Sequence, residues 1–110
     1  MPTALQESLN ATKKAHYALL AISEYDRKDW SPQDQQKYTY NLNNNSKRIL
    51  KAELVMSQGG NGAMQQYEDQ LRNAARSLEN TLNDQSNLRL MVSSINNGLG
   101  VLDELIELVR

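Results

Sequence analysis

A seven-residue repeat in the second half of the chain limits the possible folds more than any other feature of the sequence. Its two sets of positions, offset by three residues, are Met64, Leu71, Leu78, Gln85, Val92, Leu99 and Ile106, and Tyr67, Ala74, Thr81, Leu88, Ile95, Leu102 and Val109. Mostly apolar residues at these positions form one continuous stripe along an α-helix. The repeat therefore predicts helical structure from residue 63 to residue 109.

Two structures satisfy this repeat. In the first, a turn at residues 83–87 folds the segment into two antiparallel helices of about 20 residues each. In the second, one helix about 70 Å long carries a coiled-coil seam and has to dimerise. The run Asn83-Asp84-Gln85-Ser86-Asn87 has low helix propensity, and Gln85 would occupy a core position in an unbroken helix. We therefore favour the turn.

Two other breaks divide the first half of the chain, at Asp29-Trp30-Ser31-Pro32 and at Gln58-Gly59-Gly60-Asn61-Gly62. The segments that they separate have helical spacing. Thr3 can cap the first helix, and Ser31 followed by Pro32 is a strong start for the second. Gly59 is a natural left-handed terminator. The asparagine-rich residues 41–46 are poor helix formers, but we expect packing of Leu42 and Ile49 to keep the second helix continuous.

The scarcity of aromatic residues supports a helical core. The chain has no phenylalanine and one tryptophan, so its core must be aliphatic, which suits helix packing better than a β-sandwich. We predict an all-α fold, with residues 1–110 as a single domain. The predicted architecture is an antiparallel up-down four-helix bundle with helices near 4–28, 32–57, 63–82 and 87–109. The alternative is a helical hairpin plus one long coiled-coil helix over 63–109.

Catalytic and metal-binding motifs are missing from the sequence. The chain has no cysteine and a single histidine, His16, which is preceded at three residues by Lys13 rather than by glutamate, unlike the Glu-x-x-His elements of di-iron bundles. No serine lies in a G-x-S-x-G motif. We therefore expect no enzyme activity, no metal and no cofactor. We also expect a cytoplasmic protein without membrane contact, because no apolar stretch reaches the roughly 20 residues that span a bilayer.

The last segment, Leu99–Arg110, is apolar on more than one face. Val101, Leu105 and Leu108 are spaced four and three residues apart, beside the repeat rather than within it. A face left over after intramolecular packing usually marks association, although a core that surrounds this helix on two sides would also explain it. The predicted interface consists of Val101, Leu105, Leu108, Gly98, Gly100 and Trp30. At the two glycines, the backbone of another helix could approach closely. Trp30 either plugs one end of the bundle or contacts a partner.

These features predict a small non-enzymatic protein of adaptor, chaperone, immunity or inhibitor type, which associates through its hydrophobic C-terminal helix. We expect a homodimer, and a protein partner that the sequence does not identify. The alternative is a nucleic-acid-associated protein that uses a basic and aromatic surface within residues 13–51, with Lys13, Lys14, Lys47, Arg48 and Lys51 as its cations. The net charge of −1 argues against that alternative.

Overall fold

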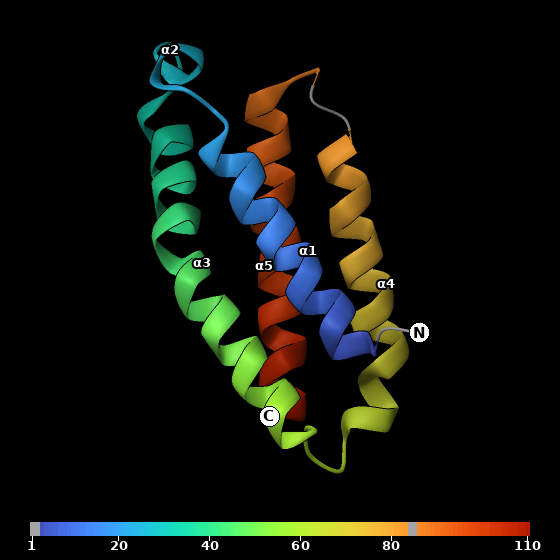
Figure 1. Cartoon of the computed structure of the whole chain (residues 1–110). Coiled ribbons are helices and arrows are strands. Elements are labelled where there is room, and N and C mark those ends of the chain that lie inside the picture. Colours follow the sequence, from blue (N-terminus) through green and yellow to red (C-terminus); the bar gives the residue numbers. More distant parts are fainter. Residues whose placement is uncertain (1–2, 84–85) are drawn as a thin grey trace.

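The computed structural model describes residues 3–83 and 86–110, and within them the chain is all-α (Figure 1). The all-α prediction is confirmed. The helices, in chain order, are α1 (Ala4–Leu20), α2 (Glu24–Arg27), α3 (Pro32–Gln58), α4 (Met64–Asn83) and α5 (Leu88–Val109).

The predicted caps lie at the ends of these helices. The side chain of Thr3 accepts a hydrogen bond from the backbone of Gln6 and begins α1, and Ser31 begins α3 in the same way with Pro32 in its first turn. Gly59 ends α3 in the left-handed conformation, with φ of 79°, which costs glycine little. The asparagine-rich residues 41–46 lie inside α3, so this helix is continuous as predicted.

The first helix is shorter than predicted. It ends at Leu20 instead of continuing to residue 28, and the four-residue α2 follows it. The reason is a capping box: the hydroxyl of Ser23 accepts from the backbone N–H of Asp26, whose carboxylate accepts from the backbone N–H of Ser23. This pair satisfies the first donors of a new helix and starts it in a new direction.

The second half of the chain forms two helices that pack on each other, as the favoured interpretation predicts. Helix α4 ends at Asn83, and the side chain of Asn87 caps α5 by accepting from the backbone of Leu90 at 3.1 Å. The single helix over 63–109 is therefore wrong. Gln85, the polar position within the repeat, lies outside the described residues.

The four long helices form two antiparallel hairpins, α1 with α3 and α4 with α5, that lie side by side (Figure 1). Across the hairpins, α1 contacts α4 and α3 contacts α5, and both of these pairs run parallel. The α1–α4 pairs Glu7–Arg72 and Lys14–Glu79 keep one sequence offset of 65, as parallel helices require. A simple up-down bundle would place consecutive helices side by side. Here α3 and α4 lie on a diagonal although one loop joins them.

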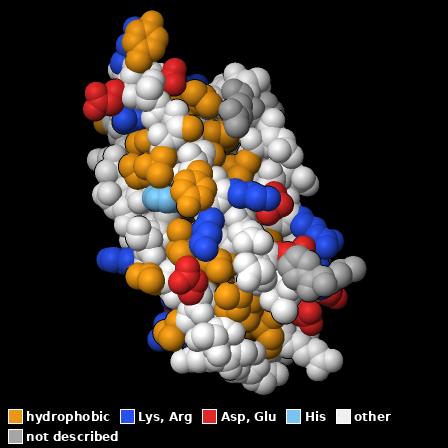
Figure 2. Space-filling view, viewed as in Figure 1, with side chains coloured by type: hydrophobic (Ala, Val, Ile, Leu, Met, Phe, Trp, Pro, Cys, Tyr) orange, Lys and Arg blue, Asp and Glu red, His pale blue; other side chains and the backbone are white. Residues whose placement is uncertain are grey.

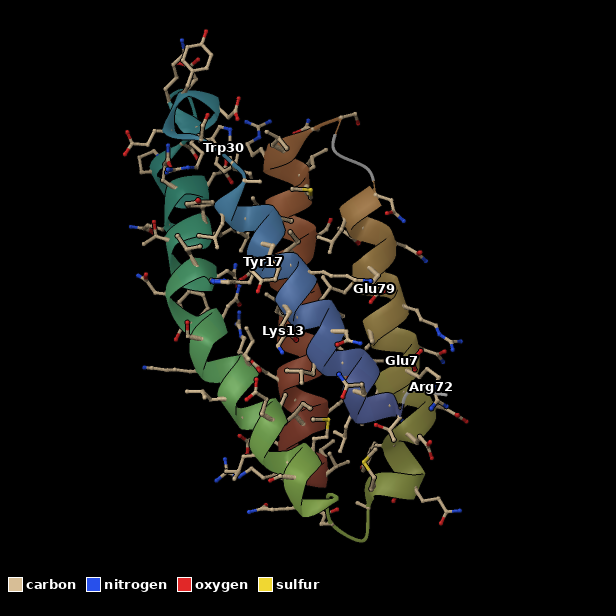
Figure 3. All side chains as sticks on the ribbon, in the orientation of Figure 1. Glu7, Lys13, Tyr17, Trp30, Arg72 and Glu79 are labelled. Atoms are coloured by element: carbon tan, nitrogen blue, oxygen red, sulfur yellow. The ribbon has the colours of Figure 1, made fainter. Side chains whose placement is uncertain are left out.

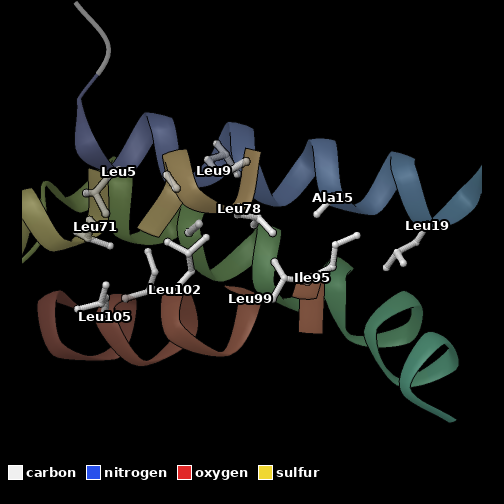
Figure 4. Close-up of a cluster of buried hydrophobic side chains, with 14 of the residues drawn as sticks. Leu5, Leu9, Ala15, Leu19, Leu71, Leu78, Ile95, Leu99, Leu102 and Leu105 are labelled. Atoms are coloured by element: carbon white, nitrogen blue, oxygen red, sulfur yellow. The ribbon is translucent and has the colours of Figure 1, made fainter. Parts of the chain in front are cut away.

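The core is mainly aliphatic and draws on all four long helices. Figure 4 labels its members from α1, α4 and α5. Most positions of the seven-residue repeat are buried in this core, as predicted. Those from α4 and α5 are Leu71, Leu78, Val92, Ile95, Leu99, Leu102, Ile106 and Val109.

An ion pair joins the outer faces of α1 and α4 (Figure 3). The carboxylate of Glu7 accepts from Nε of Arg72 at 2.6 Å and from Nη2 of Arg76 at 3.4 Å. The hydrogen bond from Arg72 is the main cause that holds the pKa of Glu7 below its ordinary value of 4.5.

Because the pKa of Glu7 is lowered on folding, its contribution to stability is complete above pH 4.5 and is lost as the pH falls through the lowered pKa. We expect Glu7→Gln to lower the melting temperature at neutral pH and to make it less dependent on pH below 4.5. Thermal unfolding followed by circular dichroism between pH 7 and pH 3 measures both effects. Glu24→Gln is the control, since Glu24 has no ion-pair partner among the described residues. If the melting temperature of Glu7→Gln fell as steeply with acid as that of the wild type, Glu7 would not be the source of this pH dependence.

Candidate functional site

The predicted interface residues of α5 divide into exposed and buried positions. Val101 and Leu108 are 49% and 47% exposed, whereas Leu105 is only 7% exposed. Figure 4 shows Leu105 beside Leu102 in the buried cluster. Leu105 follows Val101 by four residues and is therefore turned about 40° around the helix, which is enough to place it in the core. The prediction that Leu105 is an interface anchor is wrong.

A third exposed side chain, Leu90, extends the exposed part of α5 and was missed in the sequence. It is 60% exposed. Leu90 precedes Val101 by 11 residues, and Val101 precedes Leu108 by 7, which are close to three and two whole helical turns. The three side chains therefore lie on one line, which we call the α5 row. The spacing of 11 and 7 residues could have predicted this row from the sequence, whereas a search for runs of apolar residues does not find Leu90.

A groove between α4 and α5 runs beside the α5 row. It consists of two adjoining hollows of about 470 and 310 Å³. Both hollows share Ser77, Thr81 and Ser94. Leu90 lines the first hollow, and Val101 lines the second. None of the described residues that line either hollow is acidic or basic. The serine, threonine and asparagine side chains among these residues can donate and accept hydrogen bonds.

The two glycines of α5 have different surroundings. A Cβ atom at Gly98 would lie 3.0 Å from Cδ1 of Leu78, so this glycine makes room for a side chain of its own neighbour α4. A Cβ atom at Gly100 would meet nothing within 4 Å. Only Gly100 is thus open to an approaching partner.

Trp30 closes one end of the core. It is partly buried, and its ring meets that of Tyr38 edge-on with 6.4 Å between the centroids. The hydroxyl of Tyr38 donates to the backbone oxygen of Leu19 at 2.9 Å, and the Arg27 guanidinium lies 4.2 Å from the Tyr38 ring centre. This arrangement corresponds to the first of the two predicted roles, a plug at the end of the helices.

Acidic partners neutralise most cations of the surface predicted for nucleic acid. Lys13 lies 3.8 Å from Glu53, and Lys14 lies 3.3 Å from Glu79. Lys51 pairs with Glu107, and Arg48 pairs with Asp103. Figure 2 shows positive and negative side chains interspersed on the face formed by α1. Such a surface lacks the cationic track that a nucleic-acid backbone requires.

His16 belongs to a polar network inside the protein. Its Nδ1 lies 3.3 Å from Nδ2 of Asn45. The amide oxygens of Asn41 and Asn45 accept from Nη1 of Arg48 at 2.8 and 2.9 Å, and both asparagines are fully buried. Among residues 3–83 and 86–110, no three acidic or histidine side chains gather as metal ligands. His16 of α1 is thus linked through Asn45 to Arg48 of α3.

No family model, curated protein or solved structure matches the chain. In the described part of the chain, no helix combines the length and the apolarity needed to cross a membrane.

Replacing each glycine of α5 by alanine tests the difference between them. Alanine is favoured over glycine in a helix by about 1 kcal/mol, so Gly100→Ala should stabilise the protein by up to about that amount. Gly98→Ala should gain clearly less, because its methyl group presses on Leu78, which is fully buried. Urea unfolding measures both changes. An equal gain in the two variants would show that the contact with Leu78 relaxes freely.

Proposed function

We propose that the chain is a small non-enzymatic helical-bundle protein that binds protein through the α5 row. One observation carries this proposal: Leu90, Val101 and Leu108 stand 47–60% exposed on a single line of α5. The line is about 27 Å long at 1.5 Å per residue. Leaving three aliphatic side chains in water forgoes the free energy of their burial, which is about 25 cal/mol for each Å² of apolar surface.

The surroundings of the α5 row suit a helical partner. The positions between its members on the same face are Ser94, Asn97 and Glu104, of which only Glu104 is charged. The groove beside the row is lined mainly by small polar residues. A helix laid along such a groove can bury its own apolar residues against the α5 row.

A second copy of the chain is the partner that the α5 row fits best. Leu90 and Leu108 lie nine residues before and after Leu99, and Asn97 and Val101 lie two residues on either side of it. A twofold axis across α5 near Leu99 would therefore set Leu90 of each protomer opposite Leu108 of its partner. Self-complementarity of this kind is what an isologous homodimer requires. We accordingly propose an antiparallel α5–α5 homodimer.

Charge placed in the α5 row should separate the protomers without unfolding them. We expect Val101→Glu combined with Leu108→Glu to give a monomer with a nearly unchanged melting temperature, because both side chains are about half exposed. Light scattering after size exclusion measures the mass, and circular dichroism measures the fold. Leu105→Glu should instead unfold the protein, since Leu105 is buried and an unpaired buried charge costs several kcal/mol.

The matched control is Leu50→Glu combined with Leu54→Glu. These two leucines are 65% and 55% exposed on α3, outside the α5 row, so this variant should keep the mass of the wild type. Loss of the dimer in both double variants would show that added charge, rather than the α5 row, decides association. A wild type that is monomeric at high micromolar concentration would remove the homodimer.

A further inference from the structure

A small cationic pocket lies between α3 and α5, on the side of α5 away from the α5 row. It has a volume of about 180 Å³ and is lined by Tyr40, Asn44, Lys47, Arg48, Lys51 and Asp103. Five of these residues come from successive turns of α3, and only Asp103 comes from α5. Pockets that take drug-sized ligands measure about 300 Å³ or more, so this pocket has room for a smaller group.

Arg48 is held rigidly in the wall of this pocket. Its side chain is 9% exposed. Nε donates to the carboxylate of Asp103 at 2.8 Å, and Nη1 donates to the buried amide oxygens of Asn41 and Asn45. The remaining amino group, Nη2, has no acceptor among the described residues. A guanidinium has five donors in a fixed plane, so the hydrogen bonds of Nε and Nη1 fix where Nη2 can point.

The charges around the pocket favour an anion. Lys47 has no acidic partner in the described part of the chain, whereas Lys51 pairs with Glu107, which is half exposed. The cations of the pocket are Lys47, Arg48 and Lys51, and the carboxylates beside them are Asp103 and Glu107. One positive charge is therefore in excess. The carboxylate of Asp103 opposes an anion, but its Oδ2 atom already accepts from Arg48.

We propose that this pocket binds a phosphate-type oxyanion, with Nη2 of Arg48 and the ammonium groups of Lys47 and Lys51 as its donors. A planar guanidinium edge next to flexible ammonium groups is the arrangement that recognises the oxygens of phosphate. Tyr40 lines the same pocket and is 56% exposed, and its ring centre lies 5.7 Å from the Arg48 guanidinium. A ring attached to the phosphate can therefore stack on Tyr40. This inference does not depend on association through the α5 row.

The test is a titration of the isotope-labelled full chain with inorganic phosphate at low and constant ionic strength, followed by nuclear magnetic resonance. We expect saturable shifts of the Arg48 Nε–H signal and of the backbone amides near residues 40–51. Lys47→Glu should weaken binding about tenfold, which corresponds to about 1.4 kcal/mol. Lys13→Glu makes the same change of charge on α1, outside the pocket, and should change the affinity by less than about twofold.

Two further titrations identify the source of the phosphate group and test whether binding is specific for phosphate. Adenosine monophosphate that binds more tightly than inorganic phosphate at the same residues identifies a phosphorylated metabolite, and equal affinity identifies free phosphate. Chloride at the same ionic strength should not produce these shifts. Equal shifts with chloride, shifts that never saturate, or equal weakening by Lys47→Glu and Lys13→Glu would each overturn the phosphate site. Because the chloride comparison uses the wild type, it remains decisive if a variant fails to fold.

Discussion

Burial of aliphatic side chains between α4 and α5 determines where the other helices can lie. Leu71 and Leu78 of α4 and Leu99 and Leu102 of α5 are almost completely enclosed, and no phenylalanine contributes to the core. Aliphatic side chains of moderate volume fill such a core only when the helices approach closely. Gly98 permits this approach because it leaves room for the side chain of Leu78. Helix α1 then packs on α4, and α3 packs on α5. The α5 row remains uncovered.

Polar contacts supplement aliphatic packing where α3 meets its neighbours. The amide of Asn41 donates to Asn96, and Arg48 donates to Asp103, so two contacts at the same sequence offset of 55 fix the register of α3 on α5. Apolar surfaces alone discriminate weakly between registers, whereas a displaced Asn41 would leave a buried amide unsatisfied at a cost of about 1–3 kcal/mol. The network also explains why α3 tolerates asparagines that are poor helix formers. We infer that it specifies one arrangement of the two hairpins.

Local rules predicted much of this fold, and tertiary contacts decided the rest. Helix caps such as Ser31 and the left-handed Gly59 depend on a few neighbouring residues, so the sequence alone located them. The break at Ser23 was missed because its partner Asp26 lies within a segment whose apolar spacing is helical. Whether Leu105 or Val101 faces solvent depends on where α4 packs, because the two differ by only about 40° around α5. The pocket near Arg48 could not be predicted, since it joins residues 55 positions apart.

The two proposed surfaces share α5 but lie on opposite sides of it. Val101 of the α5 row and Asp103 of the phosphate pocket are two residues apart, which places them about 160° apart around the helix axis. A partner on one side therefore leaves the other side open. Occupation of the pocket can affect association only by moving α5 itself, to which Arg48 of α3 is bound through Asp103. Since a ligand shifts an equilibrium only through different affinities for its two states, the geometry favours independent binding at the two surfaces.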